Sequence, residues 1–156
     1  DLGSSWVSHY PDGRAFGRVA GLGMNAEEMS KNNALTEFKV CDLNKDPKLP
    51  FEDASFDVVT CTVSIDYFTK PLAVVAETAR ILRKGGTFAL VISNRLFFSK
   101  AVALWTGKDD EEHIYTVGSY LHYVAKGALS HPAAIDLRPP PRGKTDPLYA
   151  GVATRV

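Results

Sequence analysis

The chain has 156 residues, 45% of them hydrophobic and 23% charged, and its 18 basic and 18 acidic residues give a formal net charge of zero. This apolar content excludes a disordered or low-complexity protein. The neutral balance argues against a nucleic-acid-binding protein, whose surface normally carries a basic excess. The length predicts one domain, residues 1–156, around a single core.

The first half of the chain alternates between predicted strands and a predicted helix. Residues 17–22 form an apolar run bounded by glycines, which is typical of a buried strand. Asn25 is a good helix N-cap and acids follow it, so a helix should begin there. Residues 36–41 alternate like a second strand, and residues 56–63 are β-branched and apolar like a central strand.

The second half begins with a predicted helix over residues 71–84. Pro71 suits the first helical position, and Gly85 and Gly86 should end the helix before an unbroken apolar strand at 87–93. A helical insertion at about 96–126 and a final strand pair should follow. The expected elements of this part are two helices and two strands, at 96–106, 113–126, 134–137 and 148–154.

These elements predict an α/β fold with a doubly wound, mostly parallel sheet. Strands that alternate with helices are joined by right-handed crossovers. The last two strands lack an intervening helix, so one of them should run antiparallel. In such sheets ligands bind at the carboxyl ends of the strands. Four segments should therefore surround one crevice, at residues 1–5, 23–24, 42–43 and 62–66.

Membrane and metal sites are not expected. No apolar stretch approaches the roughly 20 residues of a membrane-spanning helix. Cys41 and Cys61 are too few for a disulfide framework or a metal site, and buried free thiols are the simpler interpretation. His113 and His122 lie about nine residues apart and should point to different faces of one helix, which argues against shared metal ligation.

A glycine pattern gives a first hypothesis about the ligand. Residues 21–26 fit G-x-G-x-x-A between a strand and a helix, and Asp42 lies about 20 residues further on, where a ribose-binding acid is expected. Taken alone, this pattern predicts NAD and an oxidoreductase. Such a short pattern is frequent by chance, and it competes with a second hypothesis.

Two longer motifs carry the second hypothesis. Residues 49–59 read LPFEDASFDVV, and residues 77–86 read ETARILRKGG. With both motifs the chain resembles the class I S-adenosylmethionine-dependent methyltransferases of the methyltransferase type 11 kind. The resemblance implies their Rossmann-like methyltransferase fold. Asp1 resembles the end of the family's first strand, so we expect that strand to be cut short and the 156 residues to form most of a domain or the ordered part of a longer chain.

A narrower resemblance points to a group of uncharacterised methyltransferase-like proteins of plants and algae. The segments that carry it are residues 4–11, 42–44, 93–95 and 146–149. This resemblance is compatible with a plastid or the cytoplasm, and no visible residue encodes a compartment.

The resemblance implies S-adenosyl-L-methionine as the cofactor and S-adenosyl-L-homocysteine as its product. The resemblance implies contacts with the methionine end of the cofactor from Asp1, Gly3, Ser4 and Ser5. It implies contacts beside the ribose and adenine from Gly23 and Met24, and at the adenine amine from Asp42 and Leu43. Thr62 and Val63 are implied on the cofactor's other side.

Two positions depart from the family pattern. The first loop has Ser5 and Val7 where the family's D-x-G-x-G-x-G has its second and third glycines. Gly23 stands where an acid normally holds the ribose hydroxyls, and that contact is lost unless Glu27 or Glu28 reaches back. Hydrogen bonds to a charged group contribute roughly 1.5–3 kcal/mol each, so the loss would weaken cofactor binding about 10- to 100-fold.

The catalytic residues stay open at this stage. Asp66, Tyr67 and His122 are the candidates, with Asp66 either a general base or a turn acid. Arg95 could bind an acidic substrate or form a surface ion pair. The aromatic-rich segment 115–123 is either a helix packed on the sheet or a substrate lid.

The leading hypothesis is S-adenosylmethionine-dependent methyl transfer to an unidentified small-molecule acceptor. The alternative is a catalytically impaired protein of the same fold that serves as a binding or assembly subunit and has a protein partner. The two departures motivate that alternative. An NAD-dependent oxidoreductase is the third hypothesis.

Overall fold

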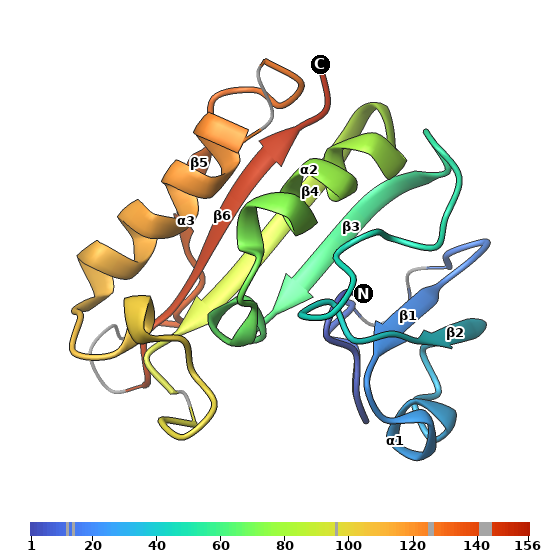
Figure 1. The fold of residues 1–156 in the computed structure, drawn as a ribbon, viewed down its shortest axis with the longest axis horizontal. Coiled ribbons are helices and arrows are strands. Elements are labelled where there is room, and N and C mark those ends of the chain that lie inside the picture. The colour runs from blue at the N-terminus through green and yellow to red at the C-terminus, as the bar shows by residue number, and fades with distance from the viewer. Residues whose placement is uncertain (12, 14, 96, 125–126, 141–144) are drawn as a thin grey trace.

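The computed structural model describes residues 1–11, 13, 15–95, 97–124, 127–140 and 145–156 (Figure 1). These described residues form six strands, three α-helices and two short 3-10 helices. The strands are β1 (Ala20–Gly23), β2 (Glu37–Val40), β3 (Phe56–Thr62), β4 (Leu82–Ser93), β5 (Ala133–Asp136) and β6 (Leu148–Thr154). The helices are α1 (Ala26–Ser30), η1 (Ile65–Tyr67), α2 (Pro71–Ile81), η2 (Ala103–Trp105) and α3 (Asp110–Val124).

The sheet is mixed, as predicted. β1 pairs with β2 and β3 pairs with β4, both in parallel. β6 lies between β4 and β5 and is antiparallel to both. The prediction of a mostly parallel sheet with an antiparallel terminal strand is therefore confirmed.

Leu2 joins the β1–β2 pair to the four-stranded part of the sheet. It forms parallel bridges to Leu22 of β1 and to Cys61 of β3. The Leu2 amide donates to the Thr60 carbonyl (2.8 Å), and the Leu22 amide donates to the Asp1 carbonyl (2.9 Å). With 2% of its surface exposed, Leu2 occupies the centre of the sheet, between β1 and β3.

Helices α2 and α3 cover one face of the sheet (Figure 1). Paired positions on this face are buried, as at Val59 beside Phe88 and Cys61 beside Leu90. α3 packs closely on β6 at Gly151. A Cβ added to this glycine would lie only 2.4 Å from the Val117 side chain. This register buries every second residue of the central strands, which is the pattern expected for a sheet with one covered face.

The predicted helix over residues 96–106 is wrong. Residues 97–101 form turns, and only η2 (Ala103–Trp105) is helical, while Leu96 lies outside the described residues. The apolar side chains of this segment share no buried stripe, because Phe97 and Phe98 are exposed and Trp105 is buried. Without such a stripe no helix face can pack against the sheet.

Helix α3 begins earlier than predicted, at Asp110 instead of His113. The Glu112 amide donates to Asp109 Oδ1 (2.9 Å), and the Asp109 amide donates to Glu112 Oε2 (3.1 Å). This reciprocal pair is a capping box, which fixes the first turn. The predicted end at Lys126 lies outside the described residues.

Helix α2 ends at Ile81 instead of Lys84, because β4 begins immediately afterwards. Leu82 already pairs with Phe56 of β3. The following residues bulge out before the regular register resumes at Thr87, and Gly85 adopts a φ of +80° in this bulge. The two glycines therefore serve a strand bulge and not a helix terminus.

The side chains of Glu77 and Arg80 clamp the loop before β3 onto α2. Arg80 donates to the carbonyls of Leu49 and Phe51 (both 2.9 Å), and Glu77 Oε2 accepts from the Leu49 amide (2.9 Å). The two side chains also pair with each other at 2.7 Å, and Arg80 reaches Asp53 at 2.6 Å. This Glu77–Arg80 clamp connects the two long sequence motifs physically.

Removing the guanidinium should destabilise the fold. We expect Arg80→Met to lower the free energy of unfolding by about 2–3 kcal/mol, because two carbonyls and two carboxylates lose a charged donor. Urea unfolding measures the change. The matched control is Arg83→Met, whose ion pair with Asp57 is largely exposed, and it should cost less than about 1 kcal/mol. Equal effects of the two variants would contradict the role of the clamp.

The clamp should also make stability depend on pH. The hydrogen bond from Arg80 holds the pKa of Glu77 below its ordinary value of 4.5. A carboxyl with a lowered folded pKa stabilises the fold above its unfolded pKa and loses that contribution as the pH falls through the folded value. The difference in unfolding free energy between wild type and Glu77→Gln should therefore shrink between pH 7 and pH 3. A constant difference over that range would contradict this assignment.

Candidate functional site

A cleft of about 670 Å³ opens at the carboxyl ends of β1, β2 and β3. Its volume lies within the range of small-molecule sites, and its position at the carboxyl edge of a parallel sheet is where such sites occur. Its lining residues come from the first loop, the end of β1 and α1, the end of β2, η1, and the segment after β4. They are Gly3, Ser4, Ser5, Leu22, Gly23, Met24, Asn25, Glu28, Cys41, Asp42, Leu43, Asn44, Ser64, Tyr67, Phe68, Phe97 and Lys100.

Most of the residues predicted to bind the cofactor meet in this cleft. Those that line it are Gly3, Ser4, Ser5, Gly23, Met24, Asp42 and Leu43. Asp1, Thr62 and Val63 do not line it. The Asp1 carboxylate instead accepts hydrogen bonds from Ser8 Oγ (2.6 Å) and Thr60 Oγ1 (3.4 Å).

The first loop turns tightly at Gly3. Gly3 has a φ of +71°, and a Cβ on it would lie 2.5 Å from the Cβ of Ser64. A side chain at position 3 is therefore excluded by both backbone conformation and space. The next residue, Ser4, is buried, and its hydroxyl has no hydrogen-bond partner among the described residues. That oxygen is fully buried and lies toward Gly21, so Ser4 lines the cleft without exposing its hydroxyl to it.

The backbone of Ser4 explains the glycine at position 23. A Cβ on Gly23 would lie 2.2 Å from the Ser4 carbonyl oxygen. An acid therefore cannot occupy this position unless the first loop moves. Gly21 has a similar constraint, since its Cβ would lie 2.5 Å from Leu35. Close packing thus accounts for both glycines of the G-x-G pattern.

Glu28 supplies a carboxylate to the same part of the cleft from α1. Its Oε1 accepts from Asn25 Nδ2 (2.8 Å), and its Oε2 accepts a hydrogen bond from the Ser5 hydroxyl. Asn25 also caps α1, because its Oδ1 accepts from the Glu28 amide (3.2 Å). Glu27 points elsewhere and pairs with Lys31 at 3.0 Å. Of the two acids considered from the sequence, Glu28 is the one that lines the cleft.

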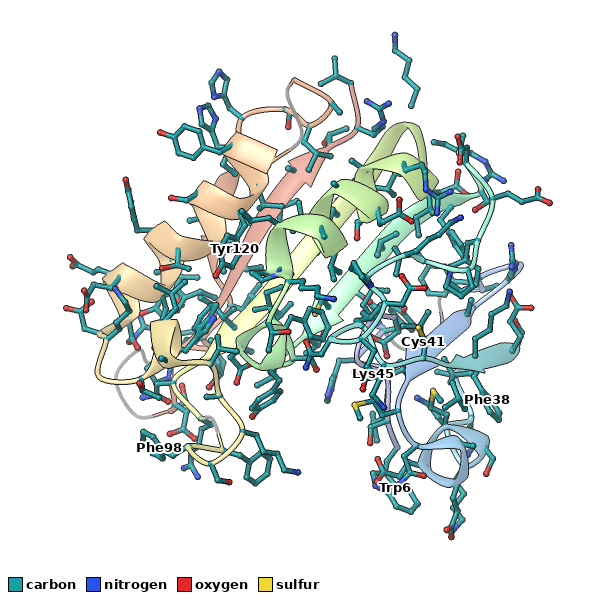
Figure 2. The ribbon with its side chains drawn as sticks, in the orientation of Figure 1. Trp6, Phe38, Cys41, Lys45, Phe98 and Tyr120 are labelled. Atoms are coloured by element: carbon teal, nitrogen blue, oxygen red, sulfur yellow. The ribbon has the colours of Figure 1, made fainter. Side chains whose placement is uncertain are left out.

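Asp42 and Asn44 shape the wall that follows β2. Asp42 Oδ1 accepts from the Asn44 amide (3.0 Å), and Asp42 Oδ2 lies 3.7 Å from Lys45 Nζ. The Asn44 side chain donates to the Tyr67 carbonyl (3.0 Å) and accepts from the Thr69 amide (2.8 Å). Asn44 therefore ties the end of β2 to η1 and fixes the width of the cleft between them. Figure 2 shows Lys45 close to this edge of the sheet.

Val63 is strained where β3 leaves the sheet. It has a φ of 49°, a region that β-branched residues rarely adopt. Its amide nevertheless donates to the Val91 carbonyl (2.8 Å), and the following Ser64 hydroxyl donates to the Thr62 carbonyl (3.0 Å). The sharp turn directs η1 across the mouth of the cleft.

The three catalytic candidates do not come together. Tyr67 lines the cleft, whereas Asp66 and His122 do not. Asp66 is 5% exposed, and burial raises the pKa of its carboxyl. His122 stacks on His131 with the ring centroids 5.3 Å apart.

Helix α3 packs on the sheet and contributes no lining residue among those described. Tyr120 of this helix is buried (Figure 2). His113, the second histidine of the helix, is also buried, and its Nε2 lies 2.9 Å from the carbonyl oxygen of Trp105. The packing interpretation of the aromatic segment 115–123 therefore fits the structure, and the lid interpretation does not. Arg95 forms an exposed ion pair with Asp146 at 2.9 Å.

Several lining residues were missed by sequence reasoning. Asn44 directly follows predicted site residues, so adjacency was the available signal, whereas Ser64 lies in the segment 62–66 that was predicted to border the crevice. Phe97 and Lys100 lie in the segment that was predicted to be helical, and no local pattern marks them. Cys41 also lines the cleft instead of being a fully buried thiol, whereas Cys61 is buried.

The described residues include no group of three or more His, Cys, Asp or Glu side chains that could hold a metal ion. Among the helices described, none has the length and apolar character to cross a membrane.

The chain resembles known proteins in both sequence and fold. The family described as "Methyltransferase domain" matches residues 3–90, more than half of the chain. A stretch of 43 residues is 44% identical to "Uncharacterized methyltransferase YcgJ" of Bacillus subtilis (strain 168), and covers 28% of this chain but only 17% of that protein.

Two solved structures show a similar fold. One is a complex between the Trm112 methyltransferase activator of Haloferax volcanii and the putative methyltransferase, with 22% identity, a TM-score of 0.59, and coverage of 92% of this chain and 74% of that one. The other is geranyl diphosphate C-methyltransferase from Streptomyces coelicolor A3(2) in complex with Mg²⁺, geranyl diphosphate and S-adenosyl-L-homocysteine. It has 15% identity, a TM-score of 0.55, and coverage of 89% of this chain and 63% of that one.

These likenesses establish the Rossmann-like methyltransferase fold. The family match runs from the first loop through β1, β2 and β3 into β4, and so includes most of the residues that line the cleft. The chain therefore belongs to the Methyltransferase domain family.

Proposed function

We propose that the cleft binds S-adenosyl-L-methionine and that the chain transfers its methyl group to a small-molecule acceptor. The observation that carries this proposal is the meeting, in one cleft, of the first loop with the ends of β1 and β2. These are the segments at which the methyltransferase resemblance implies cofactor contacts.

The residues present fit this cofactor. Its ribose hydroxyls and adenine amine are hydrogen-bond donors, and the carboxylates of Glu28 and Asp42 both line the cleft. The Gly3 turn keeps the first loop free of a side chain that would fill the space beside Ser64.

Glu28 replaces the missing acid at position 23 in this proposal. Two hydrogen bonds, from Ser5 and Asn25, orient its carboxylate at the cleft wall. Each carboxylate oxygen has two lone pairs, so both can accept further hydrogen bonds from ribose hydroxyls. The departure at Gly23 therefore moves the carboxylate from the end of β1 to α1 without removing it from the cleft.

When bound, the cofactor supplies an electrophilic methyl group, so the chain's own residues need mainly to position the acceptor and exclude water. Burial raises the pKa of Tyr67, so its phenol keeps its proton at neutral pH. Its oxygen accepts a hydrogen bond from the Phe97 amide at 3.1 Å. Tyr67 therefore acts as a positioning group in this proposal and not as a general base.

We also propose that the chain is related to the methyltransferase-like proteins of plants and algae. The segments 4–11, 42–44, 93–95 and 146–149 carry this proposal. The titrations below test the cofactor binding on which the proposed methyl transfer depends.

Calorimetric titration with S-adenosylmethionine and S-adenosylhomocysteine tests the cofactor. We expect both to bind, and Asp42→Ala to weaken binding at least several-fold, because Asp42 lies in the wall at the predicted adenine position. Lys48→Ala, which removes a side chain outside the cleft, is the control and should leave affinity unchanged. No binding at millimolar cofactor would rule out the enzyme and leave the binding-subunit alternative. Enhanced NADH fluorescence would instead favour the oxidoreductase.

Glu28→Gln tests the replacement of the ribose acid. We expect affinity for S-adenosylhomocysteine to fall about 10-fold, since the variant keeps the size of the side chain but loses its charge. An analogue that lacks both ribose hydroxyls should bind to wild type more weakly than S-adenosylhomocysteine does. Glu28→Gln should bind this analogue as tightly as wild type does. Glu27→Gln, on the same helix but outside the cleft, is the control. Equal losses for both compounds in Glu28→Gln would contradict contact with the ribose.

A further inference from the structure

One wall of the cleft is unlike the rest. η1 and the segment that follows β4 contribute Tyr67, Phe68, Phe97 and Lys100, so this wall is aromatic and carries a cation. The opposite wall contains the acids Glu28 and Asp42. Phe97 and Lys100 lie beyond residues 3–90, the part of the chain that the family match covers. The part of this aromatic wall formed by Phe97 and Lys100 therefore lies outside the matched region, whereas Tyr67 and Phe68 lie inside it.

Contacts hold the aromatic wall in place. The Phe97 amide donates to the Tyr67 hydroxyl (3.1 Å), and the two rings lie 6.4 Å apart between centroids with planes tilted by 34°. The amide of Val102 donates to the carbonyl of Asp66 (2.9 Å), which anchors the other end of the segment to η1. The segment is thus fastened at two points beside the mouth of the cleft.

Phe97 exposes a large apolar surface at this wall. It is 69% exposed although it lines the cleft, and the neighbouring Phe98 is 76% exposed but does not line it. Figure 2 shows Phe98 projecting from the outer edge of the segment. An exposed aromatic ring beside a cleft gains free energy when an apolar ligand covers it.

Lys100 supplies a positive charge that the described residues leave uncompensated. Its Nζ lies 5.6 Å from the centroid of the Phe97 ring, and no described carboxylate lies within 4 Å of it. Lys45 and Lys108, by contrast, have acidic partners at 3.7 and 3.3 Å. Within the described part of the chain, Lys100 is also the only cation that lines the cleft. An anionic group on a ligand would supply the missing partner.

We propose that the aromatic wall binds the methyl acceptor, and that this acceptor is an apolar molecule, aromatic in its simplest form, that carries a carboxylate or phosphate. The proposal rests on the proposed function, since cofactor bound at the acidic wall leaves the aromatic wall to the acceptor. Phe97 and Tyr67 contact the apolar part, and Lys100 pairs with the anion.

Three naphthalene compounds of similar size test the charge preference. They are 1-naphthoate, 1-naphthylmethanol and 1-naphthylmethylammonium, titrated with and without saturating S-adenosylhomocysteine. We expect naphthoate to bind at least about 10-fold more tightly than the neutral and cationic compounds, a difference of about 1.4 kcal/mol. 1-Naphthyl phosphate, titrated alongside, shows which anion is preferred. Equal affinity for all compounds, or a preference for the cation, would overturn the proposal.

Matched variants test the residues. Lys100→Met should abolish the preference for naphthoate, whereas Lys84→Met, an exposed lysine of β4 outside the cleft, should preserve it. Phe97→Ala should weaken all naphthalenes several-fold, whereas Phe98→Ala should not. If Lys100→Met weakens S-adenosylhomocysteine and leaves naphthoate binding intact, Lys100 belongs to the cofactor and the proposal fails.

The same titrations separate this inference from the proposed function. S-Adenosylhomocysteine alone tests the cofactor site, and the naphthalenes without it test the aromatic wall. Loss of cofactor binding with a retained preference for naphthoate would overturn the methyltransferase proposal and keep the anionic apolar site. Cofactor binding without a preference for naphthoate would overturn the anionic apolar site and keep the methyltransferase proposal.

Discussion

The backbone pairing of Leu2 is the constraint on which the cleft depends. Held between β1 and β3, Leu2 makes the two parts one sheet and fixes where the first loop begins. Gly3 then turns with a positive φ, and Ser4 passes so close to Gly23 that no side chain fits there. Under the proposed function, the carboxylate that an acid at position 23 would supply comes instead from Glu28 on α1. The main-chain hydrogen bonds at the centre of the sheet thus constrain which side chains can reach the cleft.

The two walls of the cleft carry opposite charges, so the cleft is electrostatically polarised from one wall to the other. Glu28 and Asp42 lie on one side, Lys100 on the other, and Tyr67 and Phe97 line the space beside Lys100. In a cleft that excludes part of the water, such a separation orients a ligand with unlike ends more strongly than it would at an open surface. The pairing of Asn44 with η1 keeps the two walls at a fixed spacing. In the proposed methyl transfer, orientation and spacing are the protein's main contributions, because the electrophile comes with the cofactor.

Local rules predicted those parts of the structure that local interactions determine. Asn25 caps α1 through bonds to residues two and three positions away, and β6 runs antiparallel because no helix precedes it. The wrong helix at 96–106 has apolar residues but no common buried face, a property that only tertiary packing defines. The start of β4 at Leu82 likewise depends on pairing with distant Phe56. Lys100 and Phe97 could not be placed in the cleft from sequence, because their positions depend on contacts with η1, some 30 residues away.

The Glu77–Arg80 clamp changes what the two long motifs mean. Both motifs meet at this contact, yet neither Glu77 nor Arg80 lines the cleft. Their shared task is to hold a loop against a helix, so mutations there are felt as unfolding and not as altered chemistry. A protein of this fold that did not transfer methyl groups would still need the clamp to stay folded. The two motifs therefore report on the fold and its stability, whereas the proposed ligand binding depends on Glu28, Asp42 and the aromatic wall.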